Sequence, residues 1–149
     1  MKNNSTILFI CILSVWLFPS CKVEPEAIHY GQDQCNFCKM NIVDKAHAAQ
    51  NVSVKGKQFK YDAIECLIRD LNKKEASQIA INRVADYGNP GEMIDAVNAH
   101  FIISPGIKSP MGANLSALSN KDKAKDLIAE HGGDLFDWTG VQNRILAKE

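Results

Sequence analysis

Hydrophobic and polar positions alternate in two neighbouring segments of the first half of the chain. Residues 48–55 alternate around Val52 and Val54, and residues 58–61 follow directly after a turn that contains Gly56. A period of two is typical of strands with one buried face, and a glycine between two such strands favours a tight turn. The pattern predicts a β-hairpin.

A helical period follows the predicted hairpin. Hydrophobic residues recur with the spacing of one helix face: Ile64, Leu67, Ile68 and Leu71. Asp62, with Glu65 three residues later, resembles a capping box, so we expect the helix to begin at Asp62. Cys66 lies at the edge of the hydrophobic face, where a small buried cysteine is the simpler interpretation and metal ligation is the alternative.

The second half of the chain repeats this order of elements. A strand around residues 79–84 and a turn-rich connection at residues 87–91 close the first half. The elements predicted after that connection are strands over residues 99–103, 115–118 and 135–138 and a helix that is capped by Ser119 and ends at Gly132. The two predicted helices begin 57 residues apart, which indicates a duplicated structure.

These elements define the expected fold class and its boundaries. We predict an α+β fold in which two small ββαβ units, over residues 35–87 and 88–140, pack as a duplicated structure. Residues 141–149 are expected to form a C-terminal tail.

The first twenty residues have the features of an export signal. Lys2 supplies a positive end, and residues 7–18 form an apolar run that is too short for a comfortable membrane span. A small residue directly before Cys21 resembles a bacterial lipobox, which predicts removal of residues 1–20 and lipidation of Cys21; an ordinary secretory signal with a chance cysteine is the alternative. Residues 21–34 are polar and are expected to form a flexible tether. The expected location is the bacterial cell envelope, lipid-anchored and facing the periplasm.

Composition and cysteine number narrow the function. The chain has 17 basic and 17 acidic residues and no basic cluster with interleaved aromatic residues, so we expect no nucleic-acid partner. Loss of Cys11 with the signal and lipidation of Cys21 would leave Cys35, Cys38 and Cys66. An odd number of cysteines in an exported domain favours a reactive or metal-binding thiol over a framework of structural disulfides.

The densest group of soft donors lies at the start of the exported domain. Cys35, Cys38 and Met40 place two thiols and one thioether within six residues. Sulfur ligands of this kind favour Cu(I), and in an extended segment Cys38 and Met40 would face the same side. Zinc binding, thiol–disulfide exchange by the two cysteines and a core-filling role for Met40 are the alternatives.

A second methionine lies in a loop between two predicted strands of the second half. Residues 104–112 contain two prolines, two glycines and Met111. The loop composition alone favours Met111 as a cap over the core, with a role as a soft ligand as the alternative. No nucleotide-binding motif or nucleophile–base pattern is evident, so we do not predict an enzyme.

Several segments of the chain, in order and with similar spacing, resemble the NosL family of copper-chaperone lipoproteins. The resembling segments are Cys38-Lys39-Met40 (cysteine-glycine-methionine in the family), Tyr61-Asp62, Met93-Ile94-Asp95-Ala96, Met111-Gly112 and His131-Gly132-Gly133. The resemblance covers nearly the whole exported domain, and Lys39 in place of glycine is a departure from it.

The resemblance implies a function and a set of site residues. It implies two small ββαβ units and a single Cu(I) held by cysteine and methionine, with Cys38 as the principal donor, Met40 and Met111 as thioether donors and Cys35 as an added thiolate. The implied role is that of a membrane-anchored metallochaperone for nitrous-oxide reductase maturation. The implied partners are that enzyme or the transporter complex that assembles its copper sites. A thiol–disulfide oxidoreductase that uses Cys35 and Cys38, or a structural zinc lipoprotein, is the alternative function.

Overall fold

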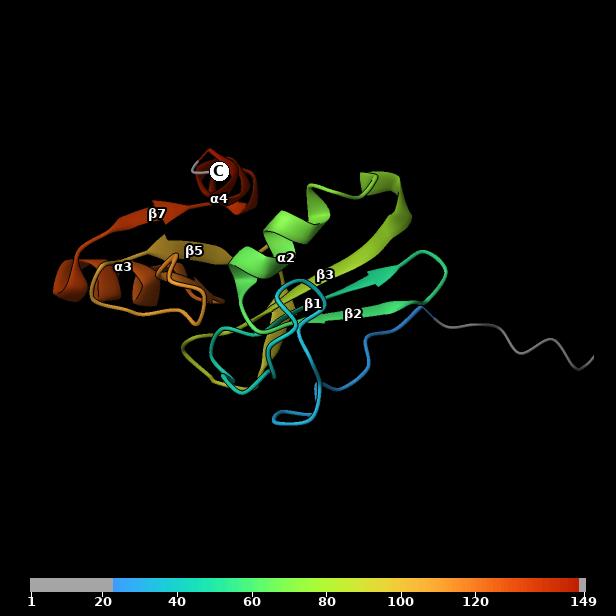
Figure 1. The fold of residues 1–149 in the computed structure, drawn as a ribbon. Helices are drawn as coiled ribbons and strands as arrows, with labels where there is room; N and C mark the ends of the chain where they lie inside the picture. Colours follow the sequence, from blue (N-terminus) through green and yellow to red (C-terminus); the bar gives the residue numbers. More distant parts are fainter. Residues whose placement is uncertain (1–22, 148–149) are drawn as a thin grey trace, which may run out of the picture.

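Two antiparallel β-sheets, each with its own helix, form the folded part of the chain (Figure 1). The computed structural model describes residues 23–147. The predicted signal and lipidation site at Cys21 lie outside the described residues. The mixed α and β content and the antiparallel sheets confirm the predicted fold class.

The first unit is a ββαβ arrangement built on the predicted hairpin. Its first strand is central, and the sheet order is β2-β1-β3-β4. The elements are β1 (Ala49–Ser53), β2 (Gln58–Tyr61), α2 (Ile64–Leu71), a short 3-10 turn (Ala76–Gln78) and β3 (Ile79–Ala85). Ala49 pairs with Tyr61 and Val52 with Gln58, so the hairpin prediction is confirmed. The hydrophobic face of α2 packs on this sheet, with Ile64, Leu67 and Ile68 buried.

The predicted capping box at the start of α2 is wrong. The helix begins at Ile64 after Ala63, which makes no side-chain cap. The carboxylate of Asp62 instead accepts a hydrogen bond from the Val43 N–H, 3.4 Å away. Glu65 is fully buried and accepts hydrogen bonds from a distant loop. Asp62 and Glu65, which the pattern assigned to local capping, therefore form tertiary hydrogen bonds instead.

The second unit repeats the same topology with a three-stranded sheet of order β6-β5-β7. Its elements are β5 (His100–Ile103), β6 (Leu115–Leu118), α3 (Lys121–His131) and β7 (Asp134–Phe136). The predicted cap of α3 is wrong by one residue, because the Asn120 side chain accepts from the Asp122 and Lys123 N–H groups. The Ser119 hydroxyl donates to Asp86 of the first unit instead.

Two elements lie outside the duplicated pattern. Strand β4 (Met93–Asp95) follows the turn between the halves and pairs with β3, so it extends the first sheet. Helix α4 (Trp138–Leu146) replaces most of the expected C-terminal tail over residues 141–149. That expectation is wrong because Val141 and Ile145 are buried on one face of α4, which contacts α2, β5 and β7.

The two units share one hydrophobic core and are joined by backbone contacts. Helices α2 and α3 begin 57 residues apart, at Ile64 and Lys121. The Tyr87 N–H donates to the Ala117 carbonyl over 2.8 Å, which links the end of β3 to β6. Core residues from both units, including Leu67 and Phe101, belong to the same buried cluster. The thiols therefore lie in a body that both units stabilise.

The segment before the first cysteine is bound to the first sheet. Lys60 donates to the Ala27 carbonyl and pairs with Asp33, both over 2.7 Å, and Ile28 packs against the core. The Gln58 side chain donates to the Glu24 carbonyl. The described part of residues 21–34 is therefore not a free tether. Among the described residues, no helix is both long and apolar enough to cross a membrane.

Candidate metal centre

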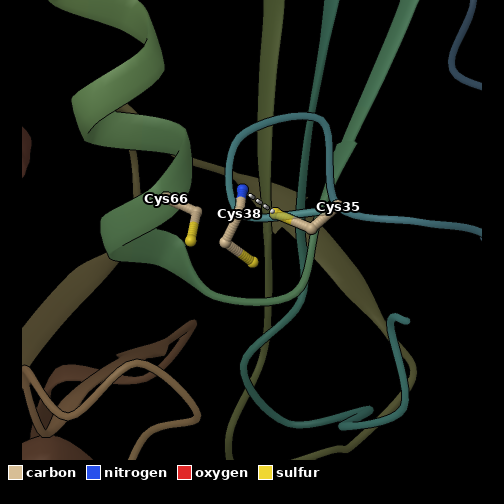
Figure 2. Close-up of side chains that lie close together, drawn as sticks. All are labelled: Cys35, Cys38 and Cys66. Carbon is tan, nitrogen blue, oxygen red and sulfur yellow. Dashed lines mark hydrogen bonds between the residues drawn. The ribbon is translucent and has the colours of Figure 1, made fainter. Parts of the chain in front are cut away.

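Three cysteine side chains converge at the N-terminal end of α2 (Figure 2). Cys35 and Cys38 lie in the turn before β1, and Cys66 lies on α2. The ligand atoms of the three residues lie within 4.8 Å of one another, and all three thiols are free. Cys35 and Cys66 are fully buried, whereas Cys38 is partly exposed.

The turn that holds Cys35 and Cys38 is closed by its own backbone. The Cys35 N–H donates to the Met40 carbonyl over 2.8 Å, and the Lys39 N–H donates back to the Cys35 carbonyl over 3.0 Å. Lys39 has a φ of 67°, a left-handed conformation that favours glycine. The glycine in the resembling family motif suits this geometry. The expectation of an extended segment, with Cys38 and Met40 on one side, is wrong because the chain turns at Lys39.

A polar clamp fixes this turn to the helix that carries Cys66. The Asn36 side chain donates to the Asp70 carboxylate over 3.0 Å, and Asp70 lies one helical turn after Cys66. The same carboxylate accepts from the Tyr61 hydroxyl over 2.6 Å and from Lys74 over 2.5 Å. Because residues four apart lie on one helix face, Asp70 brings the turn to the face from which Cys66 projects.

The three thiols differ in acidity. A hydrogen bond from the Cys66 thiol lowers the pKa of Cys35 to about 5, and backbone N–H groups act in the same direction despite burial. One of these is the Cys38 N–H, 3.5 Å from Cys35 Sγ. The same hydrogen bond raises the pKa of Cys66, and burial raises the pKa of Cys38. Cys35 is therefore the most acidic thiol of the centre, and a metal that bound all three sulfurs would displace the protons that remain on the others.

The donor set suits a soft monovalent ion. Structural zinc sites use four ligands, and in the described part of the chain no histidine or carboxylate joins the three cysteines. Thiol–disulfide exchange needs an accessible attacking thiolate, but Cys35, which has the lowered pKa, is fully buried and lies in a turn, not at a helix N-terminus. Three thiol donors without an oxygen ligand favour Cu(I).

The predicted ligand set also contains two methionines, Met40 and Met111. Met40 is 46% exposed at the end of the cysteine turn. Met111 is half-buried in the loop before β6 and packs against the core cluster that contains the cysteines. Copper ligation by Met40 and Met111 stays a prediction.

Cys66 is the residue that the sequence pattern undervalued. Its place at the edge of a hydrophobic helix face favoured a packing role, and its partners lie about thirty residues earlier in the chain. The signal that pointed to it is the odd number of cysteines, because a third exported thiol has no partner for a disulfide when the other two pair.

A second polar constellation lies elsewhere in the core. Asp44, His47 and Ser116 form a chain of hydrogen bonds of 2.7 and 3.0 Å, in the order of an acid, base and nucleophile. The sequence pattern did not reveal it. Ser116 is fully buried and His47 is 3% exposed, so no substrate reaches the hydroxyl. The constellation joins the first unit to β6 of the second.

Comparison with known proteins gives consistent matches. A sequence model of the NosL family matches residues 27–146. The copper-binding lipoprotein NosL of Stutzerimonas stutzeri is 25% identical over 132 residues, which span 83% of this chain and 69% of that protein. The crystal structure of the copper chaperone NosL from Shewanella denitrificans shares the fold, with a TM-score of 0.70 at 20% identity over 79% of this chain and 95% of that one. The match covers both units and the segment that carries the cysteine turn, and so the chain belongs to the NosL family.

Proposed function

We propose that this protein is a Cu(I) metallochaperone whose cargo is held by Cys35, Cys38 and Cys66. The convergence of three free sulfur donors within 4.8 Å carries the proposal. Membership of the NosL family supports it, as do the names of the relatives, which describe copper binding and copper chaperoning. Met40 and Met111 are the candidate thioether ligands that complete or exchange with this set.

The burial of the three thiols suggests how copper is handed over. Cys35 and Cys66 face the core, whereas Cys38 is partly exposed. A low-coordinate Cu(I) bound there accepts an incoming ligand from the side of Cys38 before the buried ligands leave. We further propose that Met40, which is 46% exposed and lies two residues after Cys38, holds the ion during the exchange.

The proposed recipient is nitrous-oxide reductase or the transporter complex that assembles its copper sites, as the family resemblance implies. The proposed location is the periplasmic face of a bacterial membrane, through lipid attached to Cys21. The relative from Stutzerimonas stutzeri is named a lipoprotein, which supports an anchor. Cys21→Ala would leave the N-terminus without a lipid, so the protein should leave the membrane fraction while its fold is unchanged. Retention of the processed variant in the membrane would contradict the anchor.

A competition experiment tests the copper assignment. The reduced protein is titrated with Cu(I) against a chromogenic chelator of known affinity, and separately with zinc against a zinc chelator. We expect one Cu(I) per chain and a clear preference for Cu(I) over zinc, because the donors are sulfur. Cys38→Ser should weaken Cu(I) binding, whereas Ser53→Ala, at the end of β1 and outside the site, serves as the control. Tighter binding of zinc than of Cu(I) would overturn the proposal.

A further inference from the structure

A small pocket between α2 and α4 is lined by two arginines that are not part of the cysteine centre. It has a volume of about 160 Å³, which is well below the roughly 300 Å³ at which pockets for drug-sized ligands begin. It is lined by Arg69, Ile103, Met111, Gly112, Ala113, Arg144 and Ile145. A space of this size admits a single side chain.

Two of the three arginines in the chain line this pocket, although they lie 75 residues apart in sequence. All the other basic residues except Arg83 are lysines. The planar guanidinium group binds carboxylates through two parallel hydrogen bonds, which lysine cannot do. Arg69 has a further partner, so the inference depends on Arg144, for which the described residues show no carboxylate partner.

The lining of the pocket contains no carboxylate that could pair with Arg144. None of the residues that line it is acidic. Glu65, which is not part of the lining, accepts hydrogen bonds from the Ser109 hydroxyl and the Ala113 N–H on the same oxygen. Arg144 therefore has no carboxylate partner within the lining.

The apolar residues of the lining favour a carboxylate on an aliphatic stem over a bare phosphate. Ile103, Met111 and Ile145 give the pocket apolar walls beside the two charged groups. A carboxylate on a short aliphatic stem uses both surfaces, whereas a bare phosphate uses only the charge. We propose that this pocket binds an acidic side chain of the protein that exchanges copper with this one, and so docks that partner beside Met111. The identity of the partner rests on the proposed function; the carboxylate site does not.

The experiment uses glutarate as a probe of the carboxylate and its stem. The full chain, purified in non-ionic detergent without copper, is titrated with glutarate and, separately, with inorganic phosphate, while the backbone amide signals of Met111, Gly112 and Ala113 are followed by NMR. We expect saturable shifts with glutarate and weaker ones with phosphate. Arg144→Gln should reduce glutarate affinity at least tenfold, as expected for loss of a hydrogen bond between charged groups.

Arg83→Gln is the matched control, because Arg83 donates to the Met93 carbonyl and lines a different pocket. It should leave glutarate binding unchanged. If Arg144→Gln fails to fold, Arg144→Lys keeps the charge and removes the planar fork, and its affinity should still fall. Absence of saturable shifts, equal affinity in the Arg144 variants, or phosphate binding as tight as glutarate would overturn the inference. None of these measurements involves copper, so the result is independent of the copper assignment.

Discussion

Replacement of Cys66 by alanine tests whether this residue is a copper ligand or only a packing residue. Cys66 is fully buried on α2, and its thiol hydrogen-bonds to Cys35. The substitution removes one heavy atom and leaves Cys35 and Cys38 in place. If only packing is lost, the protein should be less stable by about 1 kcal/mol, as for removal of one buried methyl group.

If Cys66 is a copper ligand, the free-energy cost in copper affinity should be larger than this loss of stability. Mutation of residues that merely orient a metal ligand typically costs about 10- to 100-fold in affinity. Loss of a direct sulfur donor should therefore exceed about 100-fold, which corresponds to roughly 2.8 kcal/mol. A drop of only about 10- to 100-fold in copper affinity would assign Cys66 an orienting role through its hydrogen bond to Cys35.

Chelator competition for Cu(I) and chemical unfolding of the copper-free protein measure the two effects separately. Ile102→Val is the matched control, since Ile102 is fully buried in the smaller core of the second unit and the change also removes one heavy atom. It should lower stability to a similar extent and leave copper affinity unchanged. A copper affinity of Cys66→Ala within threefold of that of the unmodified protein would refute the three-thiol site.

Three further changes test other parts of the structure. Met111→Leu should cost under about 1.5 kcal/mol of stability and clearly lower Cu(I) affinity, whereas Met93→Leu should not lower it; equal affinity in both variants would remove Met111 from the ligand set. Lys39→Gly should raise the free energy of unfolding by about 1 kcal/mol, because it relieves a left-handed conformation at φ 67°, and a less stable variant would contradict this. Burial raises the pKa of Asp86, but hydrogen bonds from Ser119, Asn89 and Gly88 outweigh it and lower the pKa below 3.8. The stability that Asp86 contributes is therefore complete above that value and is lost as pH falls, so the unfolding energies of the protein and Asp86→Asn should converge in acid; a constant difference from pH 7 to pH 3 would exclude the linkage.

The elements that were predictable are those whose pattern is local and long enough. The alternation around Val52 and the period of Ile64, Leu67 and Ile68 identified β1 and α2 without knowledge of the rest of the chain. Strand β4, with three residues, was missed because a strand that short is defined by its partner β3 and not by its own period. Both cap assignments failed because Asp62 and Ser119 bond to residues far away in sequence.

The candidate site was predictable only as far as its residues are close in sequence. Cys35 and Cys38 form one motif, and its spacing indicated soft-metal chemistry. The third thiol joins them because Asp70, one turn after Cys66, holds the Asn36 side chain. A contact between a turn and a helix of this kind leaves no periodic signal, so the convergence emerges only from the fold.

Strand β4 comes after the turn between the halves in sequence but belongs to the first sheet, so the two copies of the duplicated unit cannot be separated at that turn. A chain severed after Tyr87 would lose β4, which leaves β3 as an open sheet edge. His47 would also lose its hydrogen-bond partner Ser116, and Asp86 would lose Ser119. An isolated first half would therefore keep all three thiols but expose the unpaired backbone groups of β3. It should aggregate through that edge and not serve as a minimal copper carrier.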